Sequence, residues 1–376
     1  MNFLIITHTN HYKAGNQYQA YAPYVREMNL WLNYCDKVNI VAPLSSDLDP
    51  HINLAYQHKD LKLHQVPHFS LIGFNDKMTT LLKLPKILKS IYREMKKADH
   101  IHLRCPGNMG LLGCIVQIFF PKIPKTAKYA GNWDPHAQQP WSYKLQKWIL
   151  SNRFLTKNMQ VLVYGNWPQQ TKNVKAFFTA TYRNKEAVSL LKRDYTGQLR
   201  FCFVGSLSEG KQPQLAFQFL LSLKSKLSQE IQFDVYGDGK LKDQMSALID
   251  KHKANNWVKL HGNQPKSEIK KVLKESHFLL LPSKSEGWPK VVAEAMFWGC
   301  LPIVTPVSCV PWMLDEGQRG LLLKGNNIKK TVSELESLLN SPSKLDVMAN
   351  NASEWSRTYT LDKFENEIMK LLEQDA

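Results

Sequence analysis

Short runs of β-branched and aromatic residues alternate with longer stretches of helical periodicity along the whole chain. Within the helical stretches, apolar residues recur every three or four positions, as Leu84, Ile87, Leu88 and Ile91 illustrate. Strands that alternate with helices favour parallel sheets covered by helices on both faces. The predicted strands form two series, 3–7, 37–42, 62–66, 100–103, 128–130 and 161–164, then 200–204, 231–236, 258–261, 278–281, 301–304 and 320–323.

Two series of strands predict an α/β protein made of two doubly wound, Rossmann-like domains. The 376 residues fit two domains of about 150–200 residues each. We predict an N-terminal domain over 1–182, a linker over 183–199, a C-terminal domain over 200–355, and a last helical segment over 356–376 that can pack back on the first domain. Open α/β sheets bind ligands at the carboxyl ends of their strands, so two facing domains would enclose a cleft lined by strand-to-helix loops.

The composition is that of an ordinary globular protein, with 43% hydrophobic and 22% charged residues. The longest apolar run, residues 110–120, is far shorter than the roughly 20 residues that a membrane-spanning helix needs. Residues 1–7 lack a basic leader and predict a first buried strand. None of the six cysteines forms a C-x-x-C pair, which predicts free thiols in a reducing cytoplasm.

The positive charge is concentrated in the first half of the chain. Residues 1–200 contain 27 Lys and Arg against 11 Asp and Glu, whereas residues 201–376 contain 22 against 21. A basic half indicates a polyanionic partner, although a generally basic composition would give the same imbalance. No nucleic-acid-binding motif accompanies the charge, so we expect no nucleic acid partner.

The segment 83–97 makes the membrane a more specific candidate partner. Its apolar positions keep helical spacing, and six cations with one Glu occupy much of the remainder. Such a helix can lie against an anionic membrane surface or a lipid-diphosphate acceptor, because lysines are attracted to anionic headgroups. It can equally pack its apolar side on the sheet of its own domain and point its lysines to solvent.

Three glycine-rich or acidic motifs are weak on their own. Residues 205–212 nearly spell a phosphate-binding P-loop, but Gln212 follows Lys211 where a magnesium-binding hydroxyl is required, which argues against a nucleoside triphosphatase. What remains is a glycine-rich turn that presents Lys211. Asp47-Leu48-Asp49 is more typical of a solvated turn than of a metal site, and Gly237-Asp238-Gly239 is a tight turn that a ligand could approach.

The segment from Ser283 to Met296 is the most informative part of the sequence. It follows a predicted apolar strand, and Pro289 is suited to the first turn of a helix. The amides of residues 290–292 and the positive end of the helix dipole would then form a phosphate site. Glu286 and Glu294 flank this site and would accept hydrogen bonds from hydroxyl groups on either side of a diphosphate, as in a nucleotide sugar. The alternative is a helix-start carboxylate beside an unrelated surface Glu.

The two glutamates belong to a longer pattern. Glu286-x7-Glu294 continues into Ala295-Met296, Gly299, Pro302-Ile303-Val304, Val310-Pro311 and Gly320-Leu321-Leu322. This pattern, over about residues 201–325, resembles glycosyltransferase family 4; the N-terminal half agrees only in size and strand pattern. The resemblance implies a GT-B architecture of two facing Rossmann-like domains, with the donor site in the C-terminal one and the acceptor side in the N-terminal one. It also implies transfer with retention of anomeric configuration and no metal or other cofactor.

The resemblance implies roles for individual residues. Glu286 would bind the donor sugar and position its reacting carbon, Lys211 would neutralise the leaving diphosphate, and Asn132 and Asp134 stand where the family often has a catalytic His. Glu294 would bind the ribose hydroxyls. The other implied donor-binding residues are Gly287, Trp288, Pro289, Lys290, Val291, Gly205, Ser206, Gly237, Gly262 and Gly15. Ser206 departs from the family, which usually has Arg there, and Lys290 or Arg104 could supply the missing charge.

We therefore predict a cytoplasmic, retaining glycosyltransferase, with attachment to the inner face of the membrane left open. Its donor would be a nucleoside-diphosphate sugar, with UDP as the expected nucleotide, and its acceptor a saccharide or lipid-linked saccharide of a surface polysaccharide or glycolipid. Two alternatives remain at this point. One is a UDP-sugar epimerase or hydrolase on the same fold, and the other is a nucleotide-sugar-binding protein that has lost catalytic power with the missing Arg.

Overall fold

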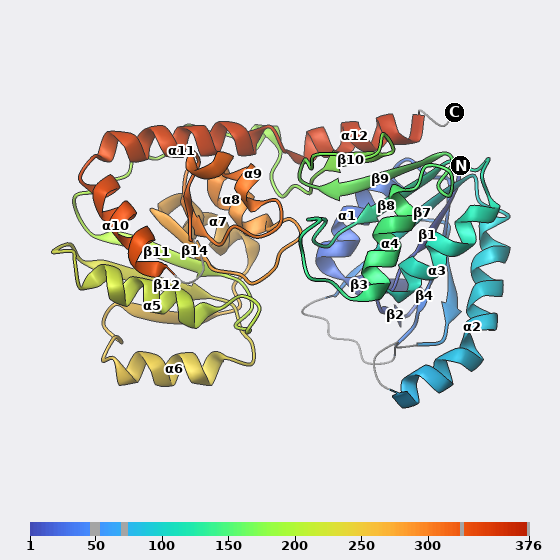
Figure 1. Ribbon diagram of the computed structural model, residues 1–376, viewed down its shortest axis with the longest axis horizontal. Helices are drawn as coiled ribbons and strands as arrows, with labels where there is room; N and C mark the ends of the chain where they lie inside the picture. The colour runs from blue at the N-terminus through green and yellow to red at the C-terminus, as the bar shows by residue number, and fades with distance from the viewer. Residues whose placement is uncertain (46–52, 69–73, 324–326, 374–376) are drawn as a thin grey trace. The chain divides into compact units, whose positions relative to one another are not determined.

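Parallel strands followed by helices build two units in the computed structural model, which describes residues 1–45, 53–68, 74–323 and 327–373. The first unit comprises Met1–Phe177 together with Glu365–Ala376, and the second comprises Phe178–Phe364. Helix α12 (Leu361–Glu373) contributes its first residues to the second unit and the rest to the first. Figure 1 shows the elements of each unit.

The first unit is built on a sheet of seven parallel strands within the described residues, in the order β10-β9-β8-β7-β1-β4-β6. Strand β1 (Asn2–Ile6) pairs with β7 (His100–Cys105) on one side and with β4 (Lys37–Pro43) on the other. The direction of winding reverses between β1 and β7, which makes this the point where an open sheet receives a ligand. The remaining strands are β6 (Leu61–Val66), β8 (Lys125–Tyr129), β9 (Met159–Tyr164) and β10 (Val174–Phe177).

Alternating side chains of β1 pack on the two faces of this sheet, as the two-residue period of a strand requires. Phe3 stacks on Trp31 of helix α1 (Ala22–Leu32), whereas Leu4 and Ile6 belong to the core beneath the opposite helices. Those helices are α2 (Phe74–Met95), α3 (Asn108–Val116) with the short 3-10 helix η1 (Gln117–Phe119), and α4 (Trp141–Ser151), which Figure 1 shows as one layer in front of the sheet.

Helix α2 contains residues 83–95 of the basic segment 83–97. Its apolar residues Ile87, Ile91 and Met95 are fully buried against the sheet, while Lys86 and Lys89 are exposed. The apolar side of this segment is thus already occupied by the protein's own core. Among the described residues, no helix combines the length and the apolar composition that crossing a bilayer requires.

The second unit has a sheet of six parallel strands in its described part, in the order β13-β12-β11-β14-β15-β16. Winding reverses between β11 (Leu199–Val204) and β14 (Phe278–Leu281), which are hydrogen-bonded neighbours. The other strands are β12 (Ile231–Tyr236), β13 (Val258–Gly262), β15 (Leu301–Val304) and β16 (Leu321–Leu322). The helices are α5 (Pro213–Lys224), α6 (Lys242–Lys251), α7 (Lys266–Glu275), α8 (Lys290–Phe297), α9 (Val310–Met313), α10 (Ile328–Leu339) and α11 (Pro342–Arg357).

The predicted linker 183–199 is an integral part of the second unit rather than a free tether. Arg193 is buried, and its guanidinium donates to the carbonyl oxygens of Ser276 at 2.9 Å and Trp298 at 2.8 Å. Ser276 and Trp298 are the C-cap residues of α7 and α8. A cation is favourable at the negative end of a helix dipole, so one arginine stabilises the ends of two helices.

Four strands were not predicted from the sequence. They are β10 and the three strands of a small antiparallel sheet, β2 (His11–Ala14), β3 (Gln17–Tyr21) and β5 (Asn53–Ala55). Strand β8 begins at Lys125, three residues before the predicted start. The side chain of Lys125 is buried, and its ammonium donates to the carbonyl oxygens of Phe120 and Ile123 at 2.6 and 2.8 Å, which explains how a lysine-rich segment forms a central strand.

Candidate active site

The reversal point of the second sheet brings two predicted loops together. The loop after β11 carries Gly205 to Gln212, and the loop after β14 carries Pro282 to Pro289. The amide of Lys284 donates to the carbonyl oxygen of Gly210 at 2.8 Å, which ties the two loops directly. Both leave the carboxyl edge of the sheet, where a ligand of this fold class binds.

Lys211 and Glu286 form a close ion pair at this edge. The Lys211 Nζ atom lies 2.5 Å from Glu286 Oε1, and the side chains are 29% and 10% exposed. A pair this sheltered is less screened than a surface salt bridge and fixes both side chains in position. The two residues predicted to hold the diphosphate and the donor sugar therefore lie in direct contact.

The backbone beside Glu286 is held by the loop after β15. The carbonyl oxygen of Gly287 accepts hydrogen bonds from Ser308 Oγ and Cys309 Sγ, both at 3.2 Å. Burial raises the pKa of Cys309 to about 12, so its thiol stays protonated and can donate. Sequence reasoning did not identify these two supports, because a Ser-Cys pair carries no distinctive motif.

Three predicted glycines line up along the ends of β11, β12 and β13. Gly237 has a φ of +130°, and a Cβ atom built on it would lie 1.9 Å from the carbonyl oxygen of Gly205. The amide of Gly237 donates to the carbonyl oxygen of Gly262 at 2.8 Å. Only glycine at position 237 allows the main chain to approach Gly205 so closely, whereas a Cβ atom would have room at Gly205 and at Gly262.

Helix α8 begins at Lys290, with Pro289 as its N-cap residue. The prediction of three outward-facing amides is wrong at Val292, whose N–H donates to the carbonyl oxygen of Pro289 at 3.0 Å. Val291 is half-buried in the first turn, and Trp288 is buried just before it. The positive end of the helix dipole thus lies next to Glu286 and Gly287.

Glu294 lies on α8 and is held by a residue that the sequence did not single out. Thr181 Oγ1 donates to Glu294 Oε1 at 2.5 Å. The helix is supported from behind by α11, because Ser356 Oγ donates to the carbonyl oxygen of Ala293 at 2.5 Å. Glu294 is thereby fixed one and a half turns inside the helix whose start faces Glu286.

Ser206 does not supply the charge that the resemblance leads one to expect. Its exposed hydroxyl lies 3.1 Å from Ser208 Oγ. Arg104, the other cation that the sequence offered, lies in the first unit and donates to Glu27 at 2.7 Å in a buried cluster that includes Lys128. Lys290, the first residue of α8, lies in the second unit.

Asn132 and Asp134 lie in the first unit, in the segment after β8. The Asn132 side chain accepts from the Asp134 amide at 2.9 Å, and Asp134 Oδ1 accepts from the His136 amide at 2.8 Å. Lys147 donates to the carbonyl oxygens of Trp133 and Asp134. Gly15 is also in the first unit, at the exposed tip of the β2–β3 hairpin with a φ of +58°, so the structure gives it a turn-forming role.

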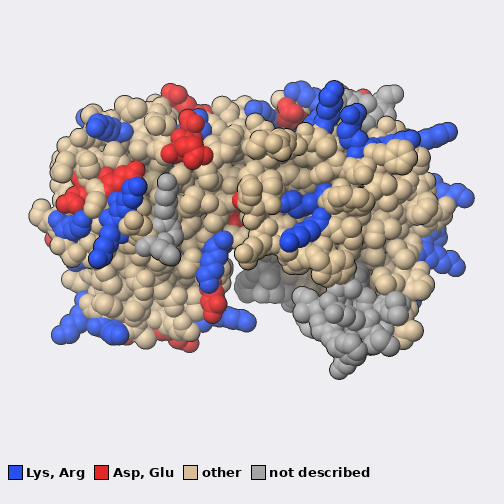
Figure 2. Space-filling view, in the orientation of Figure 1, with Lys and Arg blue, Asp and Glu red and all other residues tan. Residues whose placement is uncertain are grey.

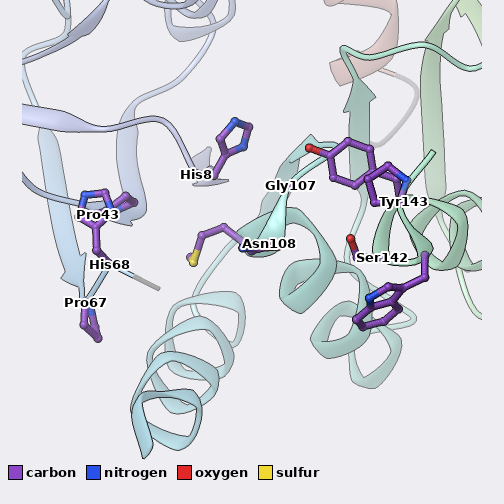
Figure 3. A pocket seen from close by; sticks show the side chains of 11 residues that line it. His8, Pro43, Pro67, His68, Gly107, Asn108, Ser142 and Tyr143 are labelled. Carbon is purple, nitrogen blue, oxygen red and sulfur yellow. The ribbon is translucent and has the colours of Figure 1, made fainter. Parts of the chain in front are cut away.

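A pocket of about 360 Å³ opens at the carboxyl edge of the first unit's own sheet. His8 follows β1, Gly107 follows β7, and Asn108 begins α3. Figure 3 shows these residues with Tyr143 on one side and Pro43 and Pro67 on the other. The remaining lining residues are Pro43, Pro67, His68, Met109, Pro140, Trp141 and Ser142. Sequence reasoning missed this pocket, although His8 directly after the first strand was an available signal.

The described residues contain no cluster of three or more His, Cys, Asp or Glu side chains that could hold a metal ion. Asp47-Leu48-Asp49 lies outside the described residues.

Comparison with known proteins identifies the second unit. Residues 184–355 match the family model of glycosyl transferases group 1. This part of the chain is therefore similar to glycosyl transferases group 1. An uncharacterized glycosyltransferase of Methanocaldococcus jannaschii is 24% identical over 369 residues, which are 94% of this chain and 96% of that protein. The amylovoran biosynthesis glycosyltransferase AmsK of Erwinia amylovora is 32% identical over 145 residues, about a third of each chain.

Solved structures extend the comparison to both units. HepE of Anabaena, in complex with UDP, superposes with a TM-score of 0.70 at 13% identity over 99% of both chains. The lipopolysaccharide outer core galactosyltransferase WaaB gives a TM-score of 0.69 at 14% identity over the full length of both chains. The protein therefore has the GT-B fold of two Rossmann-like domains, which confirms the predicted fold class. The names of the M. jannaschii protein, AmsK and WaaB all describe glycosyltransferases.

Proposed function

We propose that the protein transfers a glycosyl group, with retention of anomeric configuration, from a nucleoside-diphosphate sugar to a saccharide or lipid-linked saccharide. UDP is the proposed nucleotide, and the enzyme is of the hexosyltransferase type. The observation that carries the proposal is the Lys211–Glu286 pair at the reversal point of the second sheet, 2.5 Å apart and beside the start of α8. HepE, a structural neighbour, was solved with UDP, which supports this nucleotide.

Each member of the pair would take one part of the donor. The diphosphate would lie against Lys211, the bare backbone of Gly205 and Gly237, and the dipole at the start of α8, all of which favour negative charge. Glu286 would turn from Lys211 to the hydroxyl groups of the donor sugar. Because charge develops on the leaving diphosphate as the glycosidic bond breaks, Lys211 would stabilise the transition state more than the bound donor.

Glu294 would bind the nucleoside end of the same donor. It lies on α8 beyond the phosphate-facing turn, with one carboxylate oxygen bonded to Thr181. Ribose hydroxyls change little during transfer, so this contact would contribute to binding rather than to rate. Metal independence is part of the proposal, since lysine and helix amides supply the positive potential that a divalent ion would otherwise provide.

The acceptor would bind in the first unit. Its pocket combines aromatic and proline surface with His8, His68, Asn108 and Ser142, a lining suited to the apolar ring faces and polar hydroxyls of a sugar. Asn132 and Asp134 are proposed as acceptor-side residues because they also follow a strand of this sheet. The proposed setting is the synthesis of a surface polysaccharide or glycolipid in the cytoplasm.

A donor screen followed by product analysis tests the proposal. Thermal shift with UDP, GDP and ADP sugars should give stabilisation by the UDP forms, because a ligand that binds the native state raises the melting temperature. With the stabilising donor and an oligosaccharide acceptor library, the product should contain a new glycosidic bond whose anomeric configuration, read by NMR, equals that of the donor. Free sugar or an epimerised donor as the sole product would contradict a transferase, and an inverted linkage would contradict retention.

A further inference from the structure

The outer surface of the helical layer of the first unit is unusually rich in exposed aromatic side chains. Among the described residues, the four most exposed aromatic side chains are Phe154, Phe119, Trp141 and Trp148, at 78, 70, 66 and 60%. All four lie on α4, on η1 or on the turn that follows α4. Soluble proteins rarely expose large apolar side chains in one place, so this concentration indicates a binding surface.

Helical spacing groups the residues of α4, and one hydrogen bond groups η1 with the turn that follows α4. Trp141, Lys144 and Trp148 are spaced three and four residues apart on α4 and therefore share one side of the helix. The Gln117 side chain on η1 donates to the carbonyl oxygen of Leu155 at 2.9 Å, which places η1 beside the turn that carries Phe154. We call the surface formed by Phe119, Trp141, Lys144, Trp148, Arg153, Phe154 and Lys157 the aromatic–basic face.

The charge of this region has one sign. Residues 100–177 contain ten Lys and Arg residues and a single acidic residue, Asp134. Lys144, Arg153 and Lys157 are exposed, and within the described part of the chain none of them has a carboxylate at salt-bridge distance. Lys157 Nζ lies 5.3 Å from the ring centroid of Phe154, so cation and aromatic ring are presented together. In Figure 2, blue is frequent and red is scarce over this unit.

The chemistry of the face selects one partner. Tryptophan and lysine together match the boundary of an anionic bilayer, where the ring enters the headgroup region and the ammonium meets phosphate. A second copy of the chain would bring equal positive charges into contact. A nucleic acid fits less well, because exposed Ile115 (38%) on the neighbouring α3 adds aliphatic surface that cannot stack on bases.

We propose that the aromatic–basic face binds the surface of an anionic lipid bilayer, with Trp148, Phe119 and Phe154 entering the headgroup region. This surface lies on α4 and η1, not on the segment 83–97 that the sequence indicated. Trp141 also lines the pocket of the first unit. If the proposed function holds, a lipid-linked acceptor in the membrane would therefore lie beside the pocket that receives its sugar.

Vesicle co-sedimentation of the full chain tests the proposal without donor or acceptor, so its outcome does not depend on glycosyl transfer. Wild type should bind vesicles of phosphatidylglycerol and phosphatidylcholine at low salt, and should bind phosphatidylcholine alone far more weakly. The aromatic variant W148A/F154A/F119A should lose at least about tenfold in vesicle affinity. The charge variant K144Q/R153Q/K157Q should lose on the order of a hundredfold.

Two control variants distinguish an effect of the aromatic–basic face from an effect of positive charge or of exposed apolar side chains elsewhere in the protein. The variant K86Q/K89Q removes two exposed cations from α2, and L191A/V347A removes two exposed apolar residues from the second unit. Both should bind vesicles like wild type, and circular dichroism should show that all variants are folded. Unchanged binding by the aromatic variant, loss of binding in K86Q/K89Q alone, or no binding of wild type to anionic vesicles would overturn the proposal. Binding to an oligonucleotide but not to vesicles, or self-association that the aromatic variant abolishes, would do the same.

Discussion

The two units place their candidate ligand-binding loops at equivalent points of similar sheets. The groups that make up these points differ, however. In the second unit the edge includes the main chain of Gly205, Gly237 and Gly262 in direct contact, together with the Lys211–Glu286 ion pair. In the first unit the edge is mostly side chains, gathered around a pocket from several separate segments. A diphosphate is recognised by amides and charge, whereas a saccharide acceptor is recognised by shape and by individual polar groups.

The largest effect is expected on the rate of glycosyl transfer, from a substitution in the second unit. Lys211→Ala should lower the rate of transfer about 100- to 1,000-fold, because it removes the cation that we propose stabilises the leaving diphosphate. Lys284→Ala, on the neighbouring loop, is the control and should stay near wild type. Initial rates at saturating donor measure both. Full activity in Lys211→Ala would mean that another group carries the leaving-group charge.

The second difference concerns glycine. Gly237→Ala should destabilise the second unit by roughly 3 kcal/mol, because its Cβ meets a backbone oxygen and its φ is positive. Gly15→Ala has a positive φ in open space and should cost only about 1 kcal/mol in the first unit. Urea unfolding of the two variants measures the contrast. Equal effects would show that the surroundings of Gly237 exclude a Cβ atom no more strongly than those of Gly15.

Each unit also contains a buried neutral histidine that should make its stability depend on pH. Burial lowers the pKa of His11 in the first unit and of His277 in the second to about 4. Between the unfolded value of 6.5 and the folded value, the unfolded chain binds more protons, so stability falls as pH falls through this window. At about pH 4.5 each histidine should cost about 2 to 3 kcal/mol relative to about pH 7.

Variants that cannot titrate isolate these contributions. His277→Gln should flatten the pH dependence of unfolding in the second unit, and His11→Gln should do so in the first. The His277 ring accepts from the Arg200 amide at Nδ1, at 3.0 Å, which protonation would break. The same pH slope in a variant and in wild type would show that the replaced histidine titrates normally.

The smallest expected effect separates the two glutamates of the donor site. Glu294→Ala should weaken UDP binding by about tenfold, the loss of one charged hydrogen-bonding partner, while the maximal rate stays near wild type. Glu286→Gln should do the reverse, lowering the rate with little loss of UDP affinity. Steady-state kinetics and UDP titration of the two variants give the comparison. A wild-type UDP affinity in Glu294→Ala would remove that residue from the nucleotide site.

The contrast between the units also explains what the sequence could reveal. Fold class and most parallel strands follow from alternating periodicity, and the tight turn at Gly237 could be predicted because its backbone geometry demands glycine. The antiparallel sheet β2-β3-β5 was missed because its strands are short and polar. The start of β8 was missed because Lys125 is charged. No local sequence feature shows that backbone carbonyl groups will accept hydrogen bonds from its ammonium.

Residues that act through long-range contacts were beyond sequence reasoning. Thr181 meets Glu294 across 113 positions of the chain, and Arg193 meets Trp298 across 105. The pocket of the first unit draws His8, His68 and Tyr143 from distant segments, and only the folded sheet brings them together. The contact of Arg104 with Glu27, 77 positions away, is a further pairing that no local sequence pattern indicates.

Calorimetric titration of UDP into wild type, Lys211→Ala and Glu286→Gln tests the central claim most directly, that the Lys211–Glu286 pair divides the donor between diphosphate and sugar. UDP contains the diphosphate but no donor sugar. Lys211→Ala should therefore lose at least about tenfold in UDP affinity, while Glu286→Gln should stay within a few-fold of wild type because the lysine is retained. UDP affinity that is unchanged in Lys211→Ala, or lost in Glu286→Gln alone, would contradict the assignment.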